Sequence, residues 1–155
     1  MFREMRRKDR QMAALEAETM LKKHNFGMLS VSGDDGYPYG VPVNYGYVFG
    51  KFYIHSTSDS SHKLDAINRN PKVCMTVIDK NEIDVPNITT HYRSVIVFGT
   101  ARIITDAAEK RSLLNDMMKS ISSNTGVLPV KGCPNTDGLV MIEITPEHCT
   151  GKVRA

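Results

Sequence analysis

The sequence predicts one mainly β domain, a small six-stranded antiparallel barrel with α-helices at its margins. Three observations lead to this prediction. β-branched and aromatic residues gather in six short segments, turn-forming residues directly join several of them, and only three stretches look helical. The glycine-rich signatures of parallel nucleotide-binding sheets, GxGxxG and GxxxxGK[ST], do not occur. With 155 residues, the chain has the length of a single domain over 1–155.

Composition places the chain among soluble globular proteins, since 41% of its residues are hydrophobic and 24% are charged. Three cysteines without CxxC spacing, together with a start that shows no signal-peptide pattern, favour a reducing cytoplasm. The longest apolar runs, such as 94–101, fall far short of the roughly 20 residues that a membrane-spanning helix needs. Residues 1–10 form a basic N-terminal arm that could meet an anion or stay solvated.

The first half of the chain is predicted to hold a helix and three strands. Good helix formers followed by cations indicate a helix over 11–24. The turn Gly33-Asp34-Asp35-Gly36 joins two β-rich segments into a hairpin, and Phe49-Gly50 turns the chain again. The predicted strands are 26–32, 37–48 and 51–56.

The second half is predicted to hold two helices, three more strands and a loop. Apolar residues at successive positions over 95–98 are typical of a central strand buried on both sides, or of one at an interface. Asp106 followed by Glu109 resembles a capping box at a helix start. The predicted helices are 60–70 and 106–120, the strands are 72–79, 92–105 and 139–145, and the loop is 122–137.

The most informative segment for chemistry runs from Phe52 to Ile67. It combines a strand, a turn rich in hydroxyl groups and a helix start, and Lys63 adds a cation. Free backbone N–H groups at the positive end of a helix suit a phosphate. The alternative is an ordinary helix cap by Ser60 or Ser61, with Lys63 in water.

Other constellations are less specific. His55, His62 and His91 lack the spacing of a metal site, so we expect no metal. No GxSxG elbow supports a hydrolase. Arg93 beside Tyr92, at the start of the most apolar strand, could face a planar anionic ligand or cap a barrel edge.

An ordered series of motifs spans nearly the whole chain, from Met5-Arg6-Arg7 to Thr150-Gly151-Lys152. The series consists of Asp35-Gly36-Tyr37-Pro38-Tyr39-Gly40-Val41-Pro42-Val43-Asn44-Tyr45, Phe52-Tyr53-Ile54-His55-Ser56, His62-Lys63-Leu64-Asp65-Ala66-Ile67, Asn70-Pro71-Lys72-Val73 and Tyr92-Arg93-Ser94-Val95-Ile96-Val97-Phe98-Gly99. Together these motifs closely resemble the nitroimidazole-resistance (Nim-type) branch of the pyridoxamine 5′-phosphate oxidase-like flavoproteins.

The resemblance implies an FMN-binding split β-barrel that forms a homodimer with two flavins at the subunit interface. It also implies the residues that touch the cofactor, transferred motif by motif. They are Val43, Asn44 and Tyr45 against the isoalloxazine, His55, Ser56, Thr57, His62 and Lys63 at the phosphate, Tyr92, Arg93 and Ser94 reaching the flavin from the partner subunit, and Lys152 near the ring.

The activity implied is reduction of a nitro group on a small heteroaromatic ring, such as a 5-nitroimidazole, by the bound flavin. Histidine titrates near neutrality, so His62 is the candidate catalytic residue that donates a proton or orients the substrate; phosphate contact is its alternative role. Two departures from related motifs stand out. Ser61 replaces a common glycine, and His62-Lys63 replaces the Arg-Lys of pyridoxamine phosphate oxidases, which argues against that reaction.

Two further hypotheses remain open. The protein could be a flavin-binding storage or sensing module without turnover, or a haem-binding split barrel with a histidine as axial ligand. In the preferred interpretation it acts on a small-molecule substrate, and we expect neither nucleic acid nor membrane as a partner.

Overall fold

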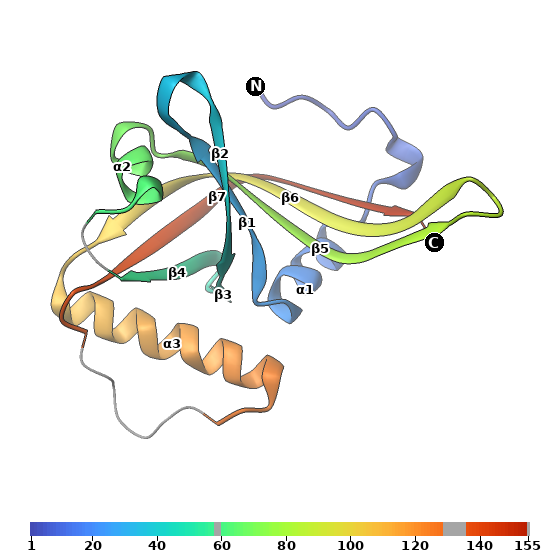
Figure 1. The fold of residues 1–155 in the computed structure, drawn as a ribbon. Coiled ribbons are helices and arrows are strands. Elements are labelled where there is room, and N and C mark those ends of the chain that lie inside the picture. Colours follow the sequence, from blue (N-terminus) through green and yellow to red (C-terminus); the bar gives the residue numbers. More distant parts are fainter. Residues whose placement is uncertain (58–59, 129–135, 155) are drawn as a thin grey trace.

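The computed structural model describes residues 1–57, 60–128 and 136–154 (Figure 1). Seven strands form one antiparallel sheet in the order β2-β1-β5-β6-β7-β4-β3, which confirms the predicted mainly β class. The strands are β1 (Phe26–Ser32), β2 (Pro38–Asn44), β3 (Gly46–Val48), β4 (Lys51–Thr57), β5 (Lys72–Asp84), β6 (Thr89–Ile104) and β7 (Leu139–Arg154). The helices are η1 (Lys8–Arg10), α1 (Ala14–Lys23), η2 (Asp34–Gly36), α2 (His62–Arg69) and α3 (Ala107–Thr125).

The sheet has seven strands rather than the predicted six because the segment 37–48 is interrupted at Tyr45. Before the interruption β2 pairs with β1, and after it β3 pairs with β4. β2 and β3 therefore lie at opposite edges of the sheet although one residue separates them in sequence. A sheet whose two edges are tied by one residue has to curl until those edges meet, and this curl produces the barrel.

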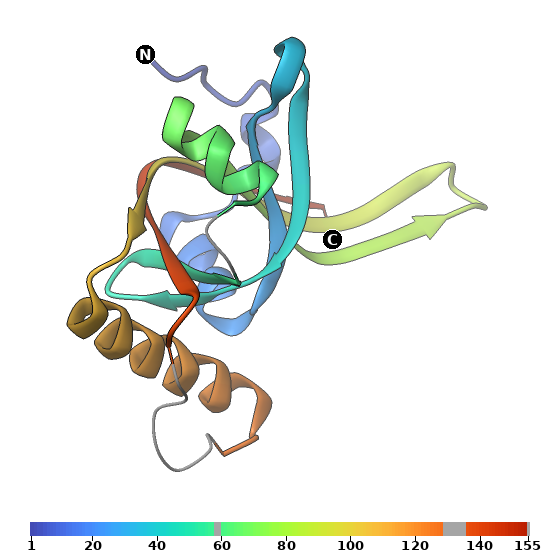
Figure 2. The same cartoon turned by 60° about the vertical axis from the view of Figure 1, so that its left-hand side comes forward.

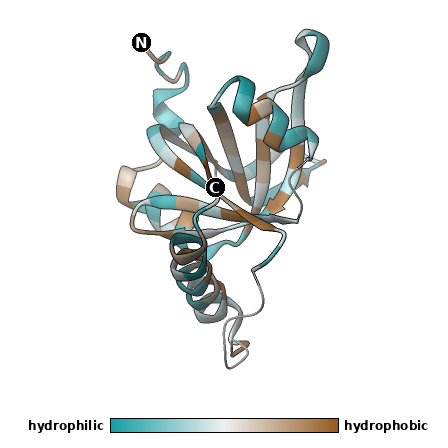
Figure 3. Ribbon diagram, turned by 90° about the vertical axis from the view of Figure 1, so that its left-hand side faces the viewer, coloured by the Kyte–Doolittle hydropathy of each residue, from teal (hydrophilic) through white to brown (hydrophobic). Residues whose placement is uncertain are grey.

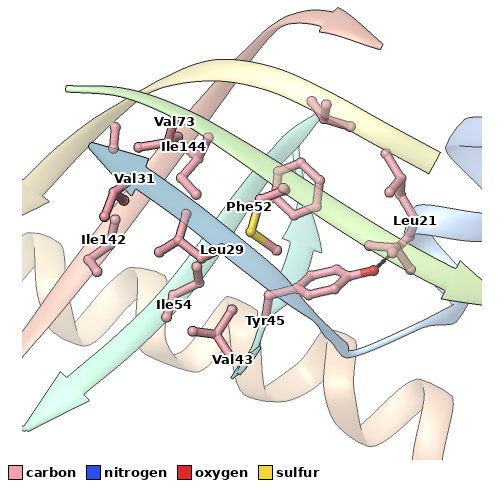
Figure 4. Close-up of a cluster of buried hydrophobic side chains, with 14 of the residues drawn as sticks. Leu21, Leu29, Val31, Val43, Tyr45, Phe52, Ile54, Val73, Ile142 and Ile144 are labelled. Atoms are coloured by element: carbon pink, nitrogen blue, oxygen red, sulfur yellow. Dashed lines mark hydrogen bonds between the residues drawn. The ribbon is translucent and has the colours of Figure 1, made fainter. Parts of the chain in front are cut away.

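Alternate residues of the strands point into the barrel and form its core. Figure 4 shows Leu29, Val43 and Ile54 converging from β1, β2 and β4. Tyr45 is fully buried among them, and its hydroxyl donates a hydrogen bond to the Leu21 carbonyl, 3.0 Å away. Figure 3 shows the most hydrophobic residues concentrated on the strands that enclose this core.

Three strands are longer than predicted. β5 and β6 continue past a register shift between Ile78 and Lys80 and form a two-stranded arm that projects from the barrel in both Figures 1 and 2. β7 extends to Arg154, instead of ending near Thr145, and pairs with β6 over almost its whole length. β6 is the fourth of the seven strands, so its predicted central position is confirmed, but it is buried on one side only, because Ile96 and Phe98 are exposed on the other.

Helices cover the outside of the barrel. α3 begins as the capping box predicted, since the Asp106 carboxylate accepts a hydrogen bond from the Glu109 N–H. It packs Leu114 and Met117 against β4 and β7, and it ends at Gly126. The predicted loop over 122–137 is thus partly helical, up to Thr125, and residues 129–135 lie outside the described residues. In the described part of the chain, no helix is long and apolar enough to cross a membrane.

The basic N-terminal arm lies against the sheet. Phe2 stacks on His148 of β7, with ring centroids 4.7 Å apart, and on Phe98 of β6. Arg10 donates a hydrogen bond to the Tyr92 hydroxyl. The arm therefore covers part of the sheet face that points away from the core, which we call the outward face. Phe26, Met28, Ile78, Ile96 and Phe98 are its exposed apolar residues.

Candidate functional site

The start of α2 offers free hydrogen-bonding groups. Ser61 stands at the N-cap position, but its hydroxyl makes no capping hydrogen bond. That oxygen is buried and has no hydrogen-bond partner in the described structure. Buried polar atoms are nearly always paired, so an orphan hydroxyl beside the free N–H groups of a helix start is where a ligand oxygen fits.

Lys63 adds a cation to the same turn. The side chain is half-buried, and it makes no hydrogen bond or ion pair with any other described residue. Helix N-termini attract anions, and a lysine on the first turn adds a point charge to the dipole. Ser61 and Lys63 together fit a phosphate group.

His62 is held in place by the β1–β2 hairpin. Its ring stacks on Tyr39, with centroids 4.0 Å apart. Its Nε2 atom lies 3.5 Å from the Asp34 carboxylate, which also pairs with Arg69. The imidazole therefore has a fixed orientation and is still about two-fifths exposed, with a side-chain exposure of 39%.

The end of β4 divides its predicted site residues between two faces. Ser56 points into the barrel, and only 5% of it is exposed. His55 and Thr57 are exposed and lie on the opposite face. Residues 58 and 59, which connect this strand to α2, lie outside the described residues.

Two of the three side chains of the segment Val43-Asn44-Tyr45 belong to the hydrophobic core. Val43 and Tyr45 are core residues, and burial raises the pKa of the Tyr45 phenol well above its ordinary value. Asn44 is exposed, and its side-chain amide donates to the Asn25 carbonyl. Only Asn44 and the backbone of this segment are available to a ligand.

The predicted residues on β6 and β7 meet at the base of the projecting arm. Ser94 pairs with Lys152 across the two strands. The Lys152 ammonium lies 5.0 Å from the centroid of the Tyr92 ring. Desolvation opposes ionisation of Tyr92, but hydrogen bonds from Arg10 and Lys152 outweigh it and lower the pKa of the phenol.

Arg93 points to the other face and serves the fold. Its guanidinium binds Asp79 at 3.0 Å and Glu16 at 2.9 Å, which ties α1 to β5 and β6. Both acids compensate its charge. Because successive residues of a strand alternate between its two sides, Arg93 faces away from Tyr92, Ser94 and Lys152 within one chain.

A hollow of about 220 Å³ lies on the outward face beside Lys152. Ile96 and Phe98 contribute apolar surface, and the N-terminal arm contributes Arg3 and Met5. Within the described residues, no carboxylate lines this hollow. The sequence showed only the basic charge of the N-terminal arm and not that the arm helps to form this hollow. The residues that line the hollow are Arg3, Met5, Ser94, Ile96, Phe98, His148, Thr150 and Lys152.

The described residues hold no group of three or more His, Cys, Asp or Glu side chains that could bind a metal ion. His55, His62 and His91 lie on different elements, β4, α2 and the β5–β6 arm. His91 is 3.5 Å from Asp84, and His62 contacts Asp34.

A family model described as pyridoxamine 5′-phosphate oxidase matches residues 13–153. The chain belongs to this family. No curated protein matches the chain.

Three solved structures illustrate the fold that the chain shares with this family. A candidate 5-nitroimidazole antibiotic resistance protein from Bacteroides thetaiotaomicron is 23% identical, with a TM-score of 0.75 over 92% of this chain and 86% of that one. A FAD-binding protein from Mesorhizobium loti is 23% identical, with a TM-score of 0.72 over 94% and 98%. A FAD- and haem-binding protein from Mycobacterium smegmatis is 19% identical, with a TM-score of 0.75 over 93% and 73%.

In this member of the pyridoxamine 5′-phosphate oxidase family, the predicted site residues form two groups at opposite ends of the folded molecule. Ser56, near α2, pairs with Val140 of β7, whereas Ser94 pairs with Lys152 of the same strand. The twelve residue-to-residue steps from 140 to 152 correspond to roughly 40 Å along the strand, at about 3.3 Å per step. Figure 1 shows α2 and the β5–β6 arm at opposite ends of the molecule. One chain alone does not bring the two groups together.

Proposed function

We propose that the protein is a homodimeric FMN-binding oxidoreductase that reduces nitroaromatic compounds of the 5-nitroimidazole type. The observation that carries the proposal is the first turn of α2, where the Ser61 hydroxyl and Lys63, which have no partner among the described residues, fit a phosphate. Membership of the pyridoxamine 5′-phosphate oxidase family supports the same cofactor class, and structural neighbours are named as flavin-binding proteins.

The outward face supports the dimer. It exposes several apolar side chains on neighbouring strands, and Ile96 and Phe98 lie on the central strand itself. A monomer seldom leaves such a contiguous patch open to water. A second copy packed against this face would bring its own Tyr92, Ser94 and Lys152 toward the α2 start of the first copy. The site would then be built from two chains.

In this arrangement the protein binds, orients and protects the flavin, and the flavin would transfer electrons from a reductant to the nitro group. Lys63 and Ser61 would hold the phosphate, and Lys152 would place a positive charge beside the ring. His62, fixed by Tyr39 and Asp34, can hold a proton at Nε2 and deliver it toward the substrate.

The first test is the absorption spectrum of the purified protein, followed by identification of the released cofactor. Flavin bands and released FMN support the proposal. A Soret band would instead support a haem protein, and released FAD would correct the cofactor.

The second test is turnover. Chemically reduced, FMN-loaded protein should be reoxidised by a 5-nitroimidazole under anaerobic conditions faster than free reduced FMN. If the bound flavin is never reoxidised faster than the free one, the protein is a flavin-binding storage or sensing module rather than this enzyme.

A further inference from the structure

The hollow beside Lys152 has a floor made by three pairs of facing residues on β6 and β7. The pairs are Ser94–Lys152, Ile96–Thr150 and Phe98–His148. Residues two apart along a strand share one side of it, so all three pairs point to the outward face. Four residue steps separate the first pair from the third, which gives a floor roughly 13 Å long at about 3.3 Å per step. The floor changes along this length from a polar, cationic end to an aromatic end.

The N-terminal arm supplies another wall of the hollow. Arg3 and Met5 line it. The chain that follows them is anchored to the edge of the same strand, because the Met12 N–H donates a hydrogen bond to the Gly151 carbonyl, 2.9 Å away. The arm therefore brings a cation to a hollow that already contains the cation of Lys152.

The aromatic end is held by three nearly parallel rings. The ring centroids of Phe98 and His148 are 6.4 Å apart, with planes inclined by 19°. Phe2 stacks on both rings and holds them against the arm. Aromatic side chains favour contact with a further planar ring, by stacking or by edge-to-face packing. This end of the hollow suits an aromatic group.

The polar end has donors without acceptors. The Arg3 guanidinium and the hydroxyls of Ser94 and Thr150 make no hydrogen bond or ion pair with any other described residue. The Lys152 ammonium lies 5.0 Å from the centroid of the Tyr92 ring, and no carboxylate from the described part of the chain lines the hollow. An acid group placed there would accept charge-assisted hydrogen bonds and balance two cations.

We propose that this hollow binds planar aromatic anions, with the ring at the end of Phe98 and His148 and the acid group between Arg3 and Lys152. Its volume of about 220 Å³ is smaller than the roughly 300–1,000 Å³ of sites for drug-sized molecules, so it suits one substituted ring. The proposal rests on the proposed reduction of nitroaromatic compounds and names the members of that class that the protein selects, those that carry an acid group.

The charge preference can be measured without turnover. Calorimetric titration of the full-length, FMN-saturated protein compares 4-nitrobenzoate with its neutral counterpart 4-nitrobenzamide. We expect the anion to bind about ten-fold more tightly. Arg3→Gln should remove most of this difference. Arg6→Gln is the matched control, since Arg6 is an exposed cation of the same arm that does not line the hollow, and it should preserve the difference. Equal affinity for the two compounds, or equal losses in the two variants, overturns the proposal.

A second pair of variants locates the bound compound. Met5→Trp fills the hollow without a change of charge, so it should weaken the binding of both compounds by about ten-fold or more. Val127→Trp places the same side chain at an exposed position just after α3 and should leave both affinities unchanged. Unchanged binding in Met5→Trp overturns the proposal, because the compounds would then bind elsewhere.

Three outcomes separate this proposal from the proposed function. Charge-selective binding by a protein whose reduced flavin is never reoxidised by nitro compounds supports the hollow and removes the enzyme. Reoxidation by nitro compounds without charge-selective binding overturns the hollow and leaves the enzyme intact. Release of FMN by 4-nitrobenzoate would show that the hollow belongs to the flavin itself, and this result also overturns the proposal.

Discussion

The imidazole of His62 lies on the phenol ring of Tyr39, with centroids 4.0 Å apart and planes inclined by 25°. The contact joins the first residue of α2 to the second residue of β2, so the β1–β2 hairpin sets the orientation of the candidate catalytic side chain. Asp34 at the tip of the same hairpin approaches the Nε2 atom of His62. The position of His62 is thus decided by a different element from the one that carries it.

Loss of this stacking should slow the proposed reaction. Tyr39→Ala frees the ring of His62 to rotate, and misplacement of a reacting group commonly lowers a rate by about ten-fold or more. Tyr39→Phe keeps the aromatic face and should react at the wild-type rate. Stopped-flow reoxidation of the reduced protein by a 5-nitroimidazole measures both. Equal losses in the two variants would assign the effect to the Tyr39 hydroxyl instead.

Lys63 should act on the phosphate end of the cofactor only. A charge-assisted hydrogen bond is worth roughly 1.5–3 kcal/mol, so Lys63→Ala should weaken FMN binding by about ten-fold to a hundred-fold. Riboflavin, which lacks the phosphate, should bind both proteins equally. Flavin titrations at fixed ionic strength provide the measurement, with Lys119→Ala on exposed α3 as the matched control. Equal losses for FMN and riboflavin would show that Lys63 supports the fold or the ring.

The buried carboxylate of Glu143 should govern stability in acid. Burial raises its pKa, but hydrogen bonds from Lys51, Tyr53 and Arg102 outweigh burial and lower the pKa below the ordinary value of 4.5. A carboxyl group with a lowered folded-state pKa stabilises the protein above its unfolded pKa, and this contribution disappears as the pH falls through the folded value.

Glu143→Ala should therefore lower the free energy of unfolding at pH 7 by about 1–3 kcal/mol, because it leaves the buried Tyr53 hydroxyl without its acceptor. Below the ordinary carboxyl pKa, the difference from wild type should shrink. Urea titrations between pH 3 and pH 7 test this, and Glu82→Ala, at an exposed ion pair, should change little. A loss that is the same at every pH would mean that packing, rather than charge, is responsible.

Local signals in the sequence were sufficient to predict the elements whose formation depends on residues close together in the chain. The capping box of Asp106 and Glu109, the turn at 33–36 and the apolar run at 95–98 each predict the observed helix start, hairpin and central strand. Other features depend on distant partners. The second half of β7 carries polar residues such as Glu147 and Lys152, and only its pairing with β6 makes it a strand.

The candidate site shows the same division. The hydroxyl-rich turn and Lys63 are neighbours in sequence, so their phosphate-binding pattern was visible there. Tyr45 matches a cofactor motif, but burial against α1 makes its side chain part of the core. The compensation of Arg93 by Asp79 and Glu16 joins three elements and has no local signature.

Mixed dimers should reveal a site built from two chains. Lys63 lies at the α2 end of the molecule and Lys152 at the base of the arm, so a shared site takes Lys63 from one copy and Lys152 from the other. Lys63→Ala and Lys152→Ala homodimers should each bind FMN weakly. When equal amounts of both chains are dissociated and reassembled, half of the dimers are mixed, and one of the two sites in each mixed dimer has neither substitution.

About a quarter of all sites should then regain wild-type affinity, because half of the dimers each restore one site in two. FMN titration of the reassembled mixture should resolve a tight class of that size, whereas unmixed samples of either variant should show none. A single-chain site predicts a different result, since every chain in the mixture still carries one substitution and no tight class can form. The absence of the tight class, in a mixture that native mass spectrometry shows to contain mixed dimers, would rule out the shared site.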